Sequence, residues 1–352
     1  DRAGKARPSN KAGARTERGT TDEIPPDILP QHTAGIVAPP RFGRGVDKND
    51  LIRGCLLGLM CGDALCAPLE SHSPEEVRER YPQGVDGMVD GCGATAHRKA
   101  GCISHVSEMA VALLRAIVET QGYAPSAARR MYWKWLETAP QDVRANIGEA
   151  IGYGKVDAGS GDNGAMMRVA PIAMYLASHP ALLFSGQEAA MSDAMLTHGN
   201  ATCATANAVF YGLLHQTLRG EPPLRIYACA VEHAMDLEDR YLAYRLINAA
   251  TDEPDFVSGR LDADSAEYSL QEACFLLLHA EDFRSAMLQV VNKPGITAAN
   301  AAIVGALLGA RFGADAIPAE WREAVLTAPA RTPLFSARAA LDIIPKVTCS
   351  YW

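Results

Sequence analysis

Three side chains of this 352-residue chain could transfer protons if the fold brings them together, namely Asp63, Glu70 and His105. Asp63 lies within a strongly apolar stretch, where an unpaired buried charge would be costly. We therefore expect it either to face a polar cleft or to pair with a buried donor. Glu70 could act as a general acid or base, or could accept hydrogen bonds from backbone amides. Two carboxylates and a histidine in one apolar-walled cleft would suit glycosidic cleavage, elimination or proton transfer.

A glycine-rich loop offers a different chemistry. Residues 159–164 read Gly-Ser-Gly-Asp-Asn-Gly and lead into a predicted helix. Exposed backbone amides at a helix N-terminus can bind phosphate, so Asn163 and Gly164 are candidate ligand-binding residues. Asp162 would oppose an anionic ligand at that place, and the alternative is a plain turn.

Helices must position these residues, because apolar residues recur at helical spacing and no strand-like alternation persists. Asp47 or Asn49 can cap a helix that runs through Met60 and should be central, since apolar residues cover nearly every face. A helix at 298–312 should pack backbone-close in the middle of the fold, because it has a face of small residues. Further helices are expected at 104–120, 124–138, 165–178, 186–197, 200–218, 223–236, 238–249, 266–279 and 281–291. The sequence therefore predicts an all-α fold.

The formal charge of −8 is unevenly distributed along the chain. Residues 1–20 carry a net charge of +4, so the remainder carries −12. An acidic body argues against nucleic acid as a partner, because phosphate binding needs clustered Lys and Arg. We predict a flexible basic tail at residues 1–47, which stays solvated or contacts a protein partner, and one helical domain at 48–352.

Cysteine usage and hydropathy indicate the environment of the protein. The nine cysteines are odd in number and form no C-x-x-C pair. Buried, reduced thiols in a cytoplasmic protein explain this pattern better than a disulfide framework. Charged residues interrupt the longest apolar runs, so no membrane association is expected.

Four segments occur in the order and spacing of one known family. They are Arg53–Glu70, Asn163–Pro171, Leu196–His198, and Asn300–Ala310 followed by Ile317–Trp321. Together they resemble the ADP-ribosylglycohydrolase family, which includes the dinitrogenase reductase-activating glycohydrolases and the jellyfish crystallins. The resemblance covers roughly residues 48–325.

The resemblance implies an all-helical orthogonal fold with a cleft that holds two magnesium ions. It also implies an enzyme that hydrolyses the glycosidic bond between ADP-ribose and a protein side chain. It places the metal ligands in a T-D-D-T-E-M stretch and in a D-T-D-[ST]-N stretch, each at the start of a helix. Here the first stretch reads Ser-His-Val-Ser from Ser104 to Ser107, and the second reads Ile-Thr-Ala-Ala from Ile296 to Ala299. Mg²⁺ needs oxygen ligands, usually carboxylates. We therefore expect neither magnesium nor another cofactor.

The resemblance also implies roles for individual residues. Glu70 matches a carboxylate implicated in the family's catalysis, and His105 replaces a metal ligand. His105 could act as an acid or base, hydrogen-bond a ligand phosphate or be a neutral filler. Thr297 and Asn300 line the same cleft or cap the last central helix. The candidate catalytic residues are Glu70, Asp63 and His105, and the candidate ligand-binding residues are Ser104, Glu108, Asn163, Gly164, Thr297 and Asn300.

Three functions remain open at this point. The leading hypothesis is a pseudoenzyme that binds a small polar or nucleotide-like ligand, or a protein. The first alternative is a metal-independent enzyme, such as a glycosidase or lyase, that uses Glu70, Asp63 and His105 on a small polar or sugar-containing substrate. The second is a structural protein of the crystallin type. Without magnesium, an unbalanced group of carboxylates would favour a cationic or hydrogen-bond-donating ligand near Glu70 and Asp63.

Overall fold

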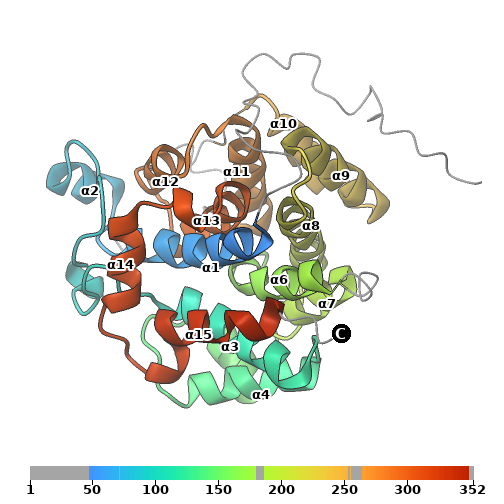
Figure 1. Ribbon diagram of the computed structural model, residues 1–352, viewed down its shortest axis with the longest axis horizontal. Coiled ribbons are helices and arrows are strands. Elements are labelled where there is room, and N and C mark those ends of the chain that lie inside the picture. Colours follow the sequence, from blue (N-terminus) through green and yellow to red (C-terminus); the bar gives the residue numbers. More distant parts are fainter. Residues whose placement is uncertain (1–46, 71, 180–185, 253, 255–263, 349–352) are drawn as a thin grey trace, which may run out of the picture.

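The structure, a computed structural model, describes residues 47–70, 72–179, 186–252, 254 and 264–348 (Figure 1). Within these ranges the regular elements are helical, and two isolated bridges are the only strand-like pairings. The all-α prediction is confirmed. The predicted tail, residues 1–47, lies outside the described residues apart from Asp47.

Fifteen α-helices follow one another along the described chain. They are α1 (Lys48–Leu65), α2 (Pro74–Arg80), α3 (His105–Thr120), α4 (Pro125–Leu136), α5 (Ala145–Tyr153), α6 (Ala170–Ser178), α7 (Gly186–Ala194), α8 (Ala201–Leu218), α9 (Pro223–Asp236), α10 (Arg240–Asn248), α11 (Ala266–His279), α12 (Phe283–Val291), α13 (Ala298–Phe312), α14 (Ala319–Thr327) and α15 (Ala337–Thr348).

The helix predicted at 165–178 is shorter than expected. A 3₁₀ turn occupies Met166–Arg168, and α6 begins only at Ala170, with Pro171 in its first turn. Proline has no N–H to continue a helix that begins before it.

Helices α1 and α13 form the centre of the molecule and run antiparallel to each other (Figure 1). The Asp47 side chain caps α1 by accepting a hydrogen bond from the Asn49 amide over 2.9 Å. The backbones touch where Gly58 faces Gly305 and where Gly54 faces Gly309, and a Cβ on any of these glycines would overlap a backbone atom of the other helix. The prediction of a small-residue face on the 298–312 helix is confirmed.

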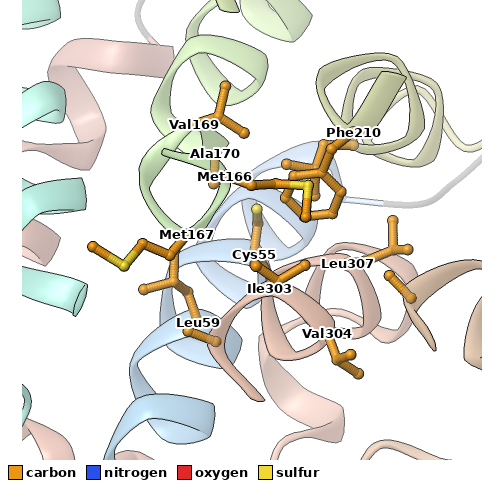
Figure 2. Packing of buried hydrophobic residues seen from close by; sticks show 14 of the residues in the cluster. Cys55, Leu59, Met166, Met167, Val169, Ala170, Phe210, Ile303, Val304 and Leu307 are labelled. Carbon is orange, nitrogen blue, oxygen red and sulfur yellow. The ribbon is translucent and has the colours of Figure 1, made fainter. Parts of the chain in front are cut away.

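The surrounding helices complete a large hydrophobic core around this pair. Figure 2 shows Cys55 and Leu59 of α1 lying against Ile303 of α13, with Met166 and Phe210 of neighbouring elements close by. Cys55 is fully buried, and burial raises the pKa of its thiol to about 12. The eight cysteines of the described residues are all free thiols, as the sequence predicts.

The same helix pair positions the polar residues of interest. Asp63 lies near the C-terminal end of α1, and the turn that follows leads to Glu70. The N-terminus of α3 meets Asp63, and the N-terminus of α13 meets Glu70. No helix in the described part of the chain is long and apolar enough to cross a membrane.

Candidate functional site

Asp63 is completely buried and holds the first turn of α3. One carboxylate oxygen accepts hydrogen bonds from the Ser104 hydroxyl (2.7 Å) and the Arg98 guanidinium (2.9 Å). The other accepts from the Ser104 amide (2.8 Å), and from the Ser107 hydroxyl and amide (2.6 and 3.2 Å). Of the two environments expected for Asp63, the structure therefore shows the buried donors.

Arg98 is the cation that the sequence analysis did not single out. Its side chain is 3% exposed. It donates to Asp63 Oδ1 over 2.9 Å and to Glu70 Oε2 over 3.0 Å. Burial acts to lower the pKa of this guanidinium, but the carboxylates of Asp63 and Glu70 outweigh burial and raise the pKa above its usual value. Arg98 thus supplies one positive charge to two carboxylates, and it occupies the place beside Asp63 and Glu70 where the sequence analysis expected a cationic or hydrogen-bond-donating ligand.

Glu70 connects this network to the second helix N-terminus. Its side chain is 22% exposed, and its carboxylate also accepts a hydrogen bond from the Ala298 amide at the start of α13. Burial raises the pKa of the Glu70 carboxyl, whereas the charge of Arg98 opposes the rise. Glu70 thus remains a partly accessible carboxyl that could bind or lose a proton.

His105 is the first residue of α3 and is 5% exposed. Neither of its ring nitrogens has a hydrogen-bond partner among the described residues, and Nε of Arg98 also has none. Burial lowers the pKa of the His105 imidazole to about 4. At neutral pH this ring is therefore uncharged, with one donor and one acceptor nitrogen available.

A pocket of about 260 Å³ lies in front of His105. Ser104, Glu108, Arg98 and Arg331 are among its walls. Glu108 is buried and accepts from Arg331 Nη2 (2.6 Å) and Nε (3.2 Å) and from the Trp135 indole (2.9 Å). Asp63 and Glu70 do not line this pocket. Asp63 and Glu70 pair with Arg98, and His105 alone of the three candidate catalytic residues lines the pocket.

The glycine-rich loop binds its own carboxylate. Asp162 accepts hydrogen bonds from the Gly164 amide (2.8 Å), Arg144 Nη1 (2.9 Å) and Asn146 Nδ2 (2.7 Å), and it lies 2.8 Å from His198 Nε2. Burial acts to raise the pKa of Asp162, but the hydrogen bond and charge of His198 and the charge of Arg144 hold it well below its usual value. The Gly164 amide is thus already paired with an anion that the protein supplies.

Asn163 and Asn300 meet at a shared serine. Both side-chain amides donate to the Ser269 hydroxyl, over 2.9 and 2.8 Å. Thr297 and Asn300 form the capping box of α13, in which the Thr297 hydroxyl also donates to Asn300 Oδ1 over 2.7 Å. Oδ1 of Asn163 is buried and has no partner among the described residues. This part of the structure joins the glycine-rich loop to the start of α13.

Three groups of predicted residues therefore emerge. Asp63 and Glu70 pair with Arg98, and Ser104 donates to Asp63. Ser104, His105 and Glu108 line the pocket. Asn163, Thr297 and Asn300 meet near Ser269, whereas Gly164 pairs with Asp162. Sequence reasoning missed Arg98, Arg331 and Ser269. Each lies far along the chain from its partners, and no local motif marks it.

The buried imidazole of His105 should make folding stability depend on pH. In the unfolded chain a histidine has a pKa near 6.5, so it binds a proton as the pH falls, whereas folded His105 does so only near pH 4. The folded state therefore loses stability below about pH 6.5, by about 2 kcal/mol between pH 7 and pH 5 from this group alone. Urea unfolding at both pH values should show this difference between the wild type and His105→Gln. Equal losses in the two proteins would contradict the prediction.

Comparisons with known proteins cover most of the chain. A model of the ADP-ribosylglycohydrolase family matches residues 45–345. The ADP-ribosyl-[dinitrogen reductase] glycohydrolase of Rhodospirillum rubrum is 27% identical over 288 residues, which span 79% of this chain and 90% of that protein. The ADP-ribosylarginine hydrolase Tri1 of Pseudomonas putida is 25% identical over 295 residues, which span 78% of this chain and 74% of that protein. A solved structure described as an ADP-ribosylglycohydrolase-related protein complex has the same fold, with a TM-score of 0.67 and 23% identity over 86% of this chain and 98% of that one.

Proposed function

The chain belongs to the ADP-ribosylglycohydrolase family, and we propose that it binds a small sugar-containing ligand without carrying out magnesium-dependent hydrolysis. The observation that carries this proposal is the position of Arg98. Its guanidinium pairs with Asp63 and Glu70 between the N-termini of α3 and α13. The protein thus supplies a cation of its own beside the helix ends at which the resemblance places magnesium ligands.

The residues at those helix ends do not fit magnesium. Val106 of α3, Ala298 of α13 and Ile296, two residues before α13, stand where the resemblance expects carboxylates, and all three are buried and carry no side-chain oxygen. No group of three or more His, Cys, Asp or Glu side chains in the described ranges could hold a metal ion. Mg²⁺ requires hard oxygen ligands in near-octahedral geometry, and these residues do not supply them.

The pocket in front of His105 is the proposed ligand site. His105 and Arg98 line this pocket, and both imidazole nitrogens and Nε of Arg98 are buried without a partner among the described residues, which leaves one acceptor and two donors for a ligand that reaches them. A sugar hydroxyl can both donate and accept, so it complements these groups. At about 260 Å³ the pocket lies just below the usual range of about 300–1,000 Å³ for drug-sized ligands. A single ribose unit therefore fits it better than a whole dinucleotide.

The test combines binding with turnover. Ribose, ADP-ribose and arginine are each titrated into the protein by calorimetry, once with Mg²⁺ and once with a chelator. We expect ribose-containing probes to bind equally well under both conditions, and we expect no release of ADP-ribose from an ADP-ribosylarginine substrate. Magnesium-dependent release of ADP-ribose would overturn the proposal.

Two variants locate the binding site. His105→Phe should fill part of the pocket and weaken ribose binding at least tenfold, because the imidazole would no longer pair with a hydroxyl. His215→Phe is the matched control, since His215 is also a buried histidine whose pKa is lowered to about 4, but it lies on α8 outside the pocket. Equal weakening by both variants would show that the effect is a general loss of stability.

A second candidate function rests on Glu70. Its carboxyl is partly exposed and its pKa is raised by burial, which suits a general acid. If the protein cleaves a glycosidic bond without metal, Glu70→Gln should abolish turnover. Slow cleavage that Glu70→Gln leaves unchanged would exclude this role.

A further inference from the structure

A cysteine and a histidine lie in hydrogen-bond contact away from the site described above. Cys92 Sγ is 3.1 Å from His72 Nε2. On the other side of the ring, His72 Nδ1 is 3.7 Å from Glu76 Oε2. A nucleophile, a base and a carboxylate that orients the base are the three groups that activate a cysteine in many enzymes.

The local structure fixes all three groups. The Cys92 amide donates to Thr95 Oγ1 over 3.2 Å, and the Thr95 hydroxyl donates to the Ala67 carbonyl over 2.6 Å, so a buried threonine anchors the loop. Gly93 has a φ of 55°, and a Cβ there would lie 2.8 Å from the His72 ring. Glycine at this position therefore allows the imidazole to reach the sulfur.

Glu76 is held in place independently of His72. Its carboxylate accepts from the Ser73 amide over 2.8 Å as part of the capping box of α2. Glu76 then favours the tautomer with the proton on Nδ1, which leaves the lone pair of Nε2 directed at the Cys92 thiol. After proton transfer, Nε2–H faces the Cys92 carbonyl, which lies 3.3 Å away and can accept its hydrogen bond.

His72 lines a pocket that a small molecule can enter, whereas Cys92 contacts two of the lining residues, His72 and Pro68, and is not itself one of them. The pocket measures about 360 Å³, and its walls include His72, Pro68, Glu79, Arg80 and Tyr81. Cys92 is half-buried, and its Sγ lies 3.3 Å from the Pro68 carbonyl on the pocket wall. Both signs of charge line the pocket, so a zwitterionic, amino-acid-derived compound suits it.

We propose that Cys92 is a reactive thiol that His72 activates for exchange with small, amino-acid-derived disulfides. His72 Nε2 takes the proton from the Cys92 thiol, and the thiolate attacks one sulfur of the disulfide. The disulfide bond breaks as the new bond forms between Cys92 and the attacked sulfur. The second sulfur leaves as a thiolate and receives the proton from His72, so the products are a mixed disulfide on Cys92 and one free thiol.

Cys102 is a matched control within the same chain. It is also half-buried, and its Sγ also lies 3.3 Å from a proline carbonyl, that of Pro329. The Cys102 thiol interacts with Lys99, and among the described residues its hydrogen-bond partner is the Pro329 carbonyl and not an imidazole.

The experiment measures which cysteine reacts. The full chain is treated with oxidised glutathione at neutral pH, and the adduct on each cysteine is followed by peptide mass spectrometry. We expect Cys92 to react at least tenfold faster than Cys102, and His72→Asn to reduce this ratio to near one. A parallel series with iodoacetamide, which needs no charged pocket, should show the same dependence on His72.

The result that overturns the proposal is a Cys92 rate no greater than that of Cys102, or a ratio unchanged in His72→Asn. Labelling of buried Cys55 reports whether a variant has unfolded. If His72→Asn unfolds, the surface variant Glu76→Gln provides the test instead. It should lower the reaction rate of Cys92 two- to threefold and leave the reaction rate of Cys102 unchanged. An unchanged Cys92 rate in that variant would contradict the role of the orienting carboxylate.

Discussion

Replacement of Arg98 by methionine should lower the free energy of unfolding by about 3–5 kcal/mol, the range for removal of one partner from a buried ion pair. Methionine keeps the unbranched apolar stem but removes the charge. Asp63 would remain fully buried, with hydrogen bonds from Ser104 and Ser107 but no cation. Glu70 is partly exposed and would regain solvent, so Asp63 should account for most of the loss. Urea denaturation at neutral pH measures the change.

Two controls separate this effect from a general loss of charge. Arg78→Met removes a cation from an ion pair with Glu75 in which both side chains are more than 60% exposed, and it should cost no more than about 1 kcal/mol. The double variant Arg98→Met with Asp63→Asn should lose less stability than the sum of its single variants, because it leaves no uncompensated charge at Asp63. Strictly additive losses, or a change under about 1 kcal/mol in Arg98→Met, would show that the pair is not energetically coupled.

The helices that are best predicted from the sequence are those whose pattern of apolar or small residues reflects burial in the core. Helix α1 is apolar on nearly every face and α13 carries a face of small residues, and both are central in the structure. The sequence analysis did not predict α2, α5, α14 or α15. Helix α2 buries none of its seven residues, α14 buries two of its nine, and α15 contains Pro345. Length does not explain why α5 was missed, because the predicted helices α6, α7, α10 and α12 also have nine residues. Helices this short depend on packing against the rest of the protein more than on their own propensity.

The polar site was harder to predict than the helices, and Asp63 shows why. A carboxylate in an apolar helix must find donors, so the need for a partner follows from the sequence. The identity of the partner does not, because Arg98 lies 35 positions away in a loop with no periodic pattern. Arg331 is 223 positions from Glu108, and Ser269 is 106 positions from Asn163. Only tertiary structure brings these charges and amides together.

Gly58→Ala is expected to destabilise the fold by about 3 kcal/mol or more, at or above the usual cost of overpacking a core. The added methyl group would overlap the Gly305 carbonyl on the facing helix, and the nearest atoms there belong to backbone, which cannot move aside as a side chain can. The two central helices would have to separate, and the contacts between Gly54 and Gly309 would weaken with them. Thermal unfolding and urea denaturation of the variant measure the loss.

Gly148→Ala is the matched control, because it makes the same chemical change inside a helix that has room for it. Gly148 lies in α5, and the nearest atom to an added Cβ is a Val143 methyl carbon 3.8 Å away, an ordinary contact. Alanine there should stabilise the protein by up to about 1 kcal/mol, since glycine is the poorer helix former. If Gly58→Ala lowers the free energy of unfolding and Gly148→Ala raises it, then backbone contact between α1 and α13, and not helix propensity, requires glycine at position 58. A stable Gly58→Ala variant would mean that the pair can separate at little cost, and that the polar network joining Asp63, Arg98 and Glu70 tolerates the movement.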